Sequence, residues 1–214
     1  LPTAFALRSG LSVEDADSGL TPLDVLDALR SYSDRITVCC DAGGIALPSG
    51  PRMGVFAFLE KTVVPMRAPR GGVFHPKAWV VRFRDDDDYV VHRLLVASRN
   101  LTFDRSWDTV LQLDEVDDGV ALPGLARLLR ACADGSMVVG PLGRQHRERL
   151  ESLAQTLARA RFSPPPGFSD LKVHPFGTST VSRSPWPFPN VVSRALVISP
   201  FLKRSFLDRF PSDW

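Results

Sequence analysis

His75-Pro76-Lys77 is the one place in the chain where a lysine follows a histidine by two positions, and it lies at the start of an apolar, strand-like run. Side chains alternate between the two faces of a strand, so the imidazole and the ammonium are expected on one surface. The chain has only four lysines among many arginines, which makes a lysine beside a histidine less expected here. By itself, however, the spacing is a weak signal.

Ser98 and Asn100 directly follow the next β-rich run and share a face if the strand persists that far. Both side chains can hydrogen-bond an anionic oxygen, so together with the first pair they predict an anion site. Taken singly, serine and asparagine are also common where a strand ends in a polar turn.

The two elements together resemble the phospholipase D superfamily, whose signature is H-x-K followed by a G-S-x-N-like element on the neighbouring strand. His75, Lys77, Ser98 and Asn100 match that signature, with Ala97 where glycine is usual. The specific match covers about residues 74–113. The family motif usually has an aspartate five positions after the lysine, where this chain has Arg82. Some branches, including the tyrosyl-DNA phosphodiesterases, also lack that aspartate.

The resemblance implies a mechanism without a metal or a cofactor. His75 would attack phosphorus and form a phosphohistidine, which divides one hard displacement into two easier steps. Lys77 would neutralise the non-bridging oxygens, and Ser98 and Asn100 would donate hydrogen bonds to the same group. An acceptor must also orient the imidazole, and Asp108 is the candidate. Asp104 and Asp114 are the alternatives.

The activity implied is that of a hydrolase: a phosphodiesterase, and more specifically a nuclease that binds and cleaves DNA or RNA. The surplus of arginine favours nucleic acid, with Arg99 and Arg105 as the expected phosphate contacts. A phospholipid phosphodiesterase is an alternative. A different class is a non-catalytic lobe that only binds phosphates through Arg99, Arg105 and Lys77.

Phospholipase D-type sites take one H-x-K from each of two lobes, one histidine acting as nucleophile and the other as general acid. This chain has one such motif. The resemblance therefore implies a partner, either a second lobe of a longer chain or a homodimer mate.

Alternating strands and helices around the motif predict an α/β fold: a phospholipase D-like lobe with a mixed β-sheet flanked by helices. The expected elements follow. Strands are predicted at residues 4–7, 36–40, 62–66, 74–83, 89–97, 108–113, 171–176 and 195–199, and helices from Thr21 onward and at residues 55–61, 123–133, 142–161 and 203–210.

Residues 1–162 are predicted to form the N-terminal lobe that carries the motif. The Pro-rich stretch at residues 163–167 then predicts a break, and residues 163–214 are expected to be a connection followed by the start of a second α/β lobe. The chain opens on Leu1 and closes just after a new strand and helix, which favours a fragment or a processed chain.

The composition and charge of the chain bear on other classes of protein. A net charge of +2 is too small to imply nucleic acid by itself. We expect no membrane span, because no apolar run reaches the length of a spanning helix, and a cytoplasmic location because the start of the chain does not resemble a signal peptide. Three cysteines do not make a disulfide framework or a zinc site.

The four successive carboxylates at residues 85–88 could bind a metal, but a solvated acidic turn between two strands is the favoured interpretation. The other three histidines are expected to be structural or uninvolved: His92, His146 and His174.

Overall fold

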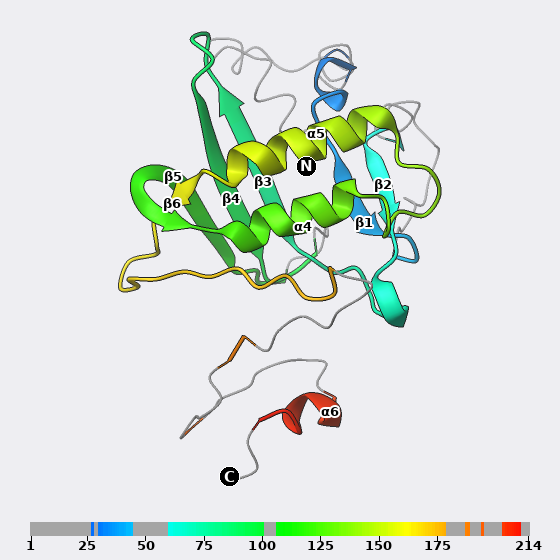
Figure 1. Ribbon diagram of the computed structural model, residues 1–214, viewed down its shortest axis with the longest axis vertical. Helices are drawn as coiled ribbons and strands as arrows, with labels where there is room; N and C mark the ends of the chain where they lie inside the picture. Colours follow the sequence, from blue (N-terminus) through cyan, green and yellow to red (C-terminus); the bar gives the residue numbers. More distant parts are fainter. Residues whose placement is uncertain are drawn as a thin grey trace.

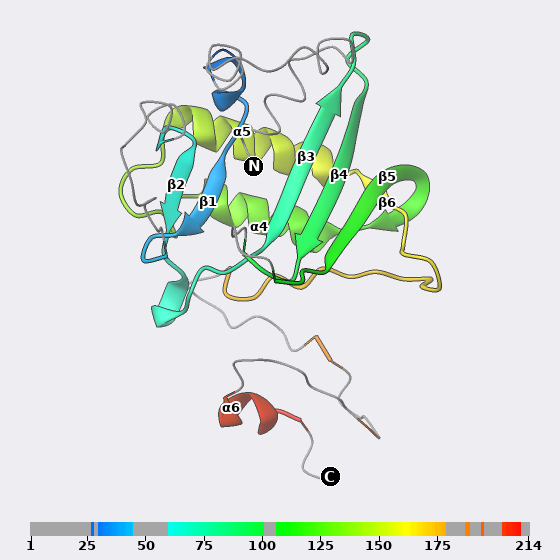
Figure 2. The same cartoon turned by 180° about the vertical axis from the view of Figure 1, so that it is seen from behind.

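The computed structural model describes residues 27, 30–44, 60–100, 106–178, 187–188, 194 and 203–210. Its strands form one curved layer, and two long helices, α4 (Pro123–Ala133) and α5 (Arg144–Leu157), cover one face of it (Figure 1). Seen from behind, the strands lie in the order β2, β1, β3, β4, β5 (Figure 2). The chain therefore has a mixed α/β architecture with sheets flanked by helices.

β1 (Val38–Asp41) and β2 (Val63–Met66) are a parallel pair. Both were predicted from short apolar runs, and both begin within two residues of the expected position. Two residues after β2, the chain forms a single 3-10 turn, η2 (Pro69–Gly71), and then runs toward β3. Thus the parallel pair leads straight into the segment that contains His75.

β3 (Ala78–Arg84), β4 (Val90–Ala97), β5 (Val110–Ala121) and β6 (Arg161–Phe162) form an antiparallel sheet in that order. The turn between β3 and β4 is the acidic run at residues 85–88. The carboxylate of Asp85 accepts the backbone N–H groups of Asp87 at 3.1 Å and Tyr89 at 2.8 Å. All four aspartates are exposed, so the prediction of a solvated acidic turn is confirmed.

β5 is much longer than the predicted strand at residues 108–113. Its first half pairs with β4 and its second half with β6, with an irregularity between Glu115 and Val120. A Cβ added at Gly119 would lie 2.6 Å from the backbone of Phe162, so the absence of a side chain there permits the close approach of β6. Sequence alternation predicted only the half that pairs with β4.

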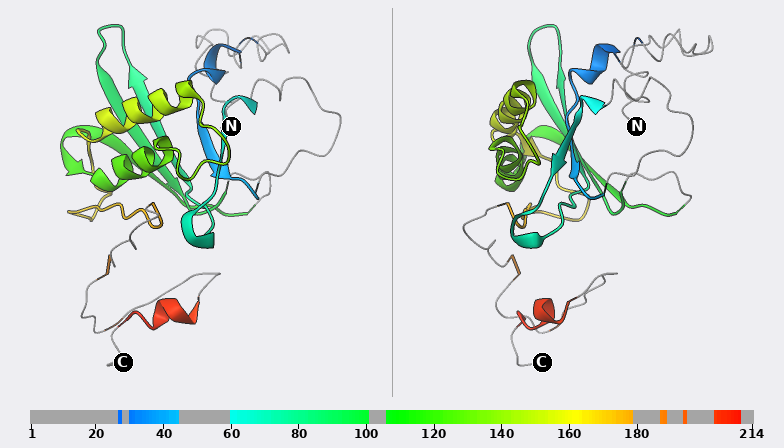
Figure 3. Two further views of the ribbon diagram at one scale, coloured as in Figure 1. Left: turned by 45° about the vertical axis from the view of Figure 1, so that its right-hand side comes forward. Right: turned by 90° about the vertical axis from the view of Figure 1, so that its right-hand side faces the viewer.

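The helices bury two clusters against the sheets, and Figure 3 shows helices and strands as separate layers. α4 begins with proline at its first position, as predicted. One cluster lies between α4 and the β1–β2 pair, and the other lies under β4 and β5. The first comprises Val64, Met66, Phe74, Ala131, Cys132, Ala133, Met137 and Leu150, and the second Leu94, Leu113, Leu122, Leu125, Leu157, Ala160 and Phe162.

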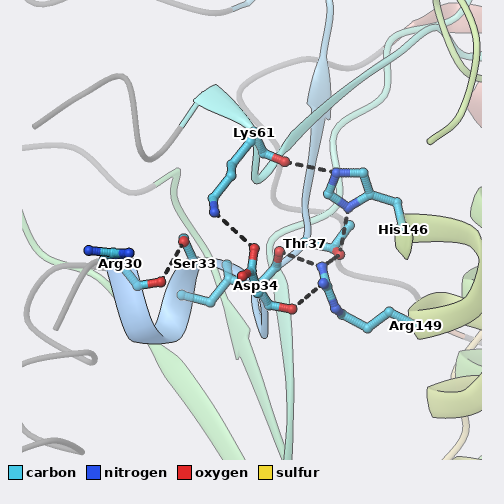
Figure 4. A network of polar contacts seen from close by, with 8 residues as sticks. Arg30, Ser33, Asp34, Thr37, Lys61, His146 and Arg149 are labelled. Atoms are coloured by element: carbon cyan, nitrogen blue, oxygen red, sulfur yellow. Dashed lines mark hydrogen bonds and ion pairs between the residues drawn. The ribbon is translucent and has the colours of Figure 1, made fainter. Parts of the chain in front are cut away.

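Polar contacts from α5 fix both halves of the strand layer. His92 of β4 is 3% exposed, and its ring lies 2.7 Å from Glu115 Oε2 and 2.9 Å from Thr156 Oγ1. Arg149 donates to the backbone carbonyl of Ile36 at 2.8 Å. His146 bridges Thr37 and the carbonyl of Lys61 (Figure 4). Both histidines therefore hold elements together, as expected.

The predicted strand at residues 171–176 is wrong, because these residues pair with no strand. They pack instead on α4. A Cβ added at Gly124 would lie 1.9 Å from the carbonyl oxygen of Val173, and Leu171 and Val173 contact the second core cluster. Past the predicted break at residue 163, the chain thus returns to the first lobe. The division into lobes at residue 162 stays a prediction.

Residues 27 and 30–33 are helical, which fits the end of the helix predicted from Thr21, and α6 (Arg204–Leu207) falls within the predicted helix at residues 203–210. The predicted strands at residues 4–7 and 195–199 and most of the helix at 55–61 lie outside the described residues. Over the described part of the chain, every helix is too short or too polar to cross a membrane.

Gly124→Ala should lower the free energy of unfolding by about 1–3 kcal/mol, because the new Cβ forces the Val173 backbone away from α4. Chemical denaturation measures this change. Gly44→Ala is the control, since its Cβ would meet only ordinary contacts at 3.7 Å. A Gly124→Ala protein as stable as the wild type would contradict the packing of residues 171–175 on α4.

Candidate active site

His75 and Lys77 lie just before β3, which begins at Ala78 rather than at the predicted residue 74. The backbone N–H of Ala97 donates to the carbonyl of Lys77 at 2.8 Å, so the pairing with β4 extends one residue beyond the strand. Lys77 Nζ lies 2.7 Å from His75 Nδ1 and 3.1 Å from Nε2. The two side chains therefore meet on one face, as their spacing predicted.

In the contact between Lys77 and His75, the ammonium can act only as a donor. An ammonium can donate a hydrogen bond to the lone pair of an unprotonated ring nitrogen, whereas two positive charges at this distance repel. Partial burial lowers the pKa of Lys77, because desolvation disfavours its charged form. His75 itself is exposed, so its ring is accessible to a ligand.

Asn100 completes this group from the end of β4. Its Nδ2 lies 3.4 Å from His75 Nε2, which is long for a hydrogen bond but directs the amide toward the imidazole. Three of the predicted residues, His75, Lys77 and Asn100, thus converge on one exposed point.

Ser98 and Asp108 make a separate contact with each other. Ser98 Oγ donates to Asp108 Oδ1 at 2.6 Å and accepts the N–H of Thr109 at 3.1 Å. The backbone N–H groups of Ser98 and Arg99 donate to the same carboxylate oxygen, each at 3.1 Å. We call this arrangement the Ser98–Asp108 turn.

In the Ser98–Asp108 turn, both residues make contacts other than those predicted for them. Ser98 was expected beside Asn100 on one face, but β4 ends at Ala97, so strand alternation no longer applies to them. Asp108 was expected to orient the imidazole, but its Oδ1 is taken up by Ser98 and Arg99. The Ser98 hydroxyl, followed by those backbone N–H groups, holds the pKa of Asp108 below its ordinary value.

Of the two alternatives to Asp108, Asp114 is engaged away from His75. Asp114 pairs with Arg93 on β4 and accepts a hydrogen bond from Gln112 at 2.9 Å. Asp104 and Arg105 lie outside the described residues. Arg99 is described, and its backbone joins the Ser98–Asp108 turn.

Sequence reasoning missed Asp41, which ends β1 and reaches the segment before His75. Its Oδ2 accepts the backbone N–H of Phe74 at 2.9 Å. Asp41 and His75 interact electrostatically. Only the position of an aspartate at the end of a predicted strand pointed to it, because 33 residues separate it from Phe74.

The described residues contain no group of three or more histidine, cysteine, aspartate or glutamate side chains arranged to hold a metal ion. A cavity after the end of β2 has a lining that includes none of these site residues: Arg67, Ala68, Pro69, Ser136, Val138, Val139 and Gly140. The candidate site therefore consists of the His75, Lys77 and Asn100 side chains, flanked by Asp41 and by the Ser98–Asp108 turn.

Asp108→Asn should make folding less stable at neutral pH and hardly change it in acid. A carboxyl whose pKa is lowered by folding stabilises the protein above its ordinary value of 3.8, and that stabilisation is lost as the pH falls below it. The difference in unfolding free energy between wild type and variant, measured by denaturation at several pH values, should therefore shrink below about pH 4.

Asp118→Asn provides the control, because Asp118 is an exposed carboxylate of β5 outside the Ser98–Asp108 turn. An Asp108→Asn difference that stays constant from neutral to acid pH would mean that the ionised carboxylate does not hold the turn.

No protein-family model, no curated protein and no solved structure matches the chain.

Proposed function

We propose that the chain is a metal-independent phosphodiesterase in which His75 attacks phosphorus. The observation that carries the proposal is the convergence of an exposed imidazole, an ammonium 2.7 Å from it and an amide 3.4 Å from it. These groups supply a nucleophile, a positive charge and a neutral donor. The resemblance of their motif to the phospholipase D superfamily supports the same assignment.

In the first step, the lone pair of one His75 nitrogen forms a bond to phosphorus. The bond from phosphorus to the leaving oxygen breaks, and that oxygen takes the electron pair and then a proton from a general acid. Lys77 and Asn100 stabilise the negative charge on the non-bridging oxygens. In the second step, water attacks phosphorus and gives its proton to the group that acted as general acid, the N–P bond breaks, and its electron pair returns to the ring.

In this proposal the general acid comes from outside this group, and His92 and His146 are engaged elsewhere in the fold. We propose that a second H-x-K lobe or a homodimer mate supplies it. A missing general acid costs about 10²- to 10⁴-fold in rate, so an isolated half-site should turn over slowly. A cytoplasmic location is part of the same proposal.

Nucleic acid is the substrate class that we favour. Trp107 is 97% exposed and immediately precedes Asp108 of the Ser98–Asp108 turn. An exposed indole next to a phosphate site can stack on a base of DNA or RNA. The exposed indole therefore supports a nucleotide substrate.

His75→Asn should reduce single-turnover cleavage of a phosphodiester by about 10³-fold or more, because it removes the nucleophile. The reaction is run in excess EDTA with an oligonucleotide and with a small aryl phosphodiester. Phosphohistidine is labile in acid, so the reaction is quenched in base. Mass spectrometry of the quenched protein should then locate the phosphoryl group on His75. His174→Asn, at an exposed histidine outside the group, should leave both readouts unchanged.

Three results would count against the enzyme. Cleavage by His75→Asn at the wild-type rate would exclude His75 as nucleophile, and activity lost with EDTA and restored by a divalent cation would indicate metal-bound water. Phosphate binding that depends on His75 and Lys77, without turnover even when a partner lobe is supplied, would favour the non-catalytic binding lobe.

Trp107→Ala should weaken binding of a single-stranded oligonucleotide by about 5- to 150-fold, which corresponds to roughly 1–3 kcal/mol for one stacked base. Titration calorimetry measures this loss. The affinity for inorganic phosphate should not change, and Trp107→Phe should retain most of the oligonucleotide affinity. Phe168→Ala, at an aromatic residue that is 69% exposed, is the matched control.

Equal loss for oligonucleotide and inorganic phosphate would show that Trp107 supports the turn rather than a base. An unchanged oligonucleotide affinity would exclude stacking of a base on Trp107.

A further inference from the structure

The Asp41 carboxylate holds the backbone of the residue that precedes His75. Its Oδ2 accepts the N–H of Phe74 at 2.9 Å, and its Oδ1 accepts the N–H of Gly43 at 3.0 Å. The Phe74 side chain is 8% exposed and belongs to the first core cluster. The residue before His75 is therefore fixed twice, by its buried ring and by the Asp41 carboxylate.

The charge of Asp41 also reaches the imidazole. The N–H of Phe74, then that of Gly43, lowers the pKa of Asp41, and the charges of His75 and Arg67 lower it further. Asp41 is consequently ionised at neutral pH. Among the described residues, Lys77 and Asn100 lie at the ring nitrogens of His75, and Asp41 from β1 interacts with it electrostatically.

Lys77 and Asp41 have opposite effects on a positive charge on the imidazole. Attack by a neutral ring nitrogen on phosphorus leaves a positive charge on the ring, and the nearby ammonium of Lys77 disfavours that charge. The Asp41 carboxylate, which interacts electrostatically with His75, offsets it. The site thus needs a negative partner for His75, the role for which the sequence predicted Asp108.

We infer that Asp41 is the positioning residue of His75: its carboxylate fixes the backbone ahead of the imidazole and stabilises the positive charge that develops on the ring. The catalytic part of this inference rests on the proposed phosphodiesterase function. The electrostatic part does not, because it concerns the imidazole itself.

Two substitutions separate charge from geometry. Asp41→Asn keeps an oxygen that can accept one backbone N–H but removes the negative charge. Asp41→Ala removes both. A residue that only closes a turn would tolerate the asparagine, since asparagine accepts hydrogen bonds in the same turns as aspartate.

The test is a titration of His75 in the full chain by NMR with labelled histidine rings, the signal being assigned by its loss in His75→Asn. In Asp41→Asn, the midpoint should move to lower pH, corresponding to about a 3- to 10-fold loss of proton affinity. His174 should titrate unchanged. Asp34→Asn is the matched control, because it removes a carboxylate that is paired with Lys61 at 2.9 Å instead.

An unchanged His75 midpoint in Asp41→Asn would overturn the inference and leave Asp41 as a turn residue. A shift of equal size in Asp34→Asn would also overturn it, because the effect would then reflect net charge alone. In single-turnover cleavage, Asp41→Asn should slow the chemical step about 10-fold with little change in substrate affinity. If the midpoint moves but no variant or wild type cleaves a phosphodiester, the positioning role stands and the proposed function fails.

Discussion

Ala97, the last residue of β4, donates its backbone N–H to the carbonyl of Lys77, just before the first residue of β3, and the candidate site depends on this pairing. The register of the hairpin aligns Ala78 with Val96. Because strands pair residue by residue, that alignment leaves His75 and Lys77 beside the residues that follow Ala97. A shift of one residue would turn the Lys77 side chain to the opposite face and separate it from Asn100.

The hairpin is in turn held by groups that the site does not use. His92 sits in the middle of β4 and contacts Glu115 on β5 and Thr156 on α5. Buried polar groups with all partners present specify one arrangement, because a shifted strand would leave them unpaired at a cost of about 1–3 kcal/mol each. The structural histidine therefore secures the register on which the exposed histidine depends.

The sequence predicted those parts of the fold that follow from local pattern. Apolar alternation located β1 to β4, and helical spacing located α4 and α5, because each needs only neighbouring residues. The second half of β5 could not be predicted, since its pairing depends on β6, about 40 residues later. Residues 171–176 resemble a strand, but the side-chain-free surface at Gly124 gives them a helix to pack on.

The candidate site likewise contains residues that local pattern predicts and residues whose contacts depend on distant parts of the chain. His75, Lys77 and Asn100 could be predicted because two strands and one turn bring them together. The partnership of Ser98 with Asp108 could not, because it depends on where β4 ends and on how the following loop returns. Asp41 is still more remote in sequence, and its contact with Phe74 requires both the parallel β1–β2 pair and the burial of an aromatic ring.

The parallel pairing of β1 with β2 has a consequence for the order in which the protein folds. The β3–β4 hairpin closes a short local loop, and hairpins form within about 1–10 μs. The parallel pair joins segments about 25 residues apart, and such non-local contacts form more slowly because more chain entropy is lost before they are made. We therefore expect the imidazole, the ammonium and the amide to come together early, while the carboxylate that restrains them arrives only when the two sheets have docked.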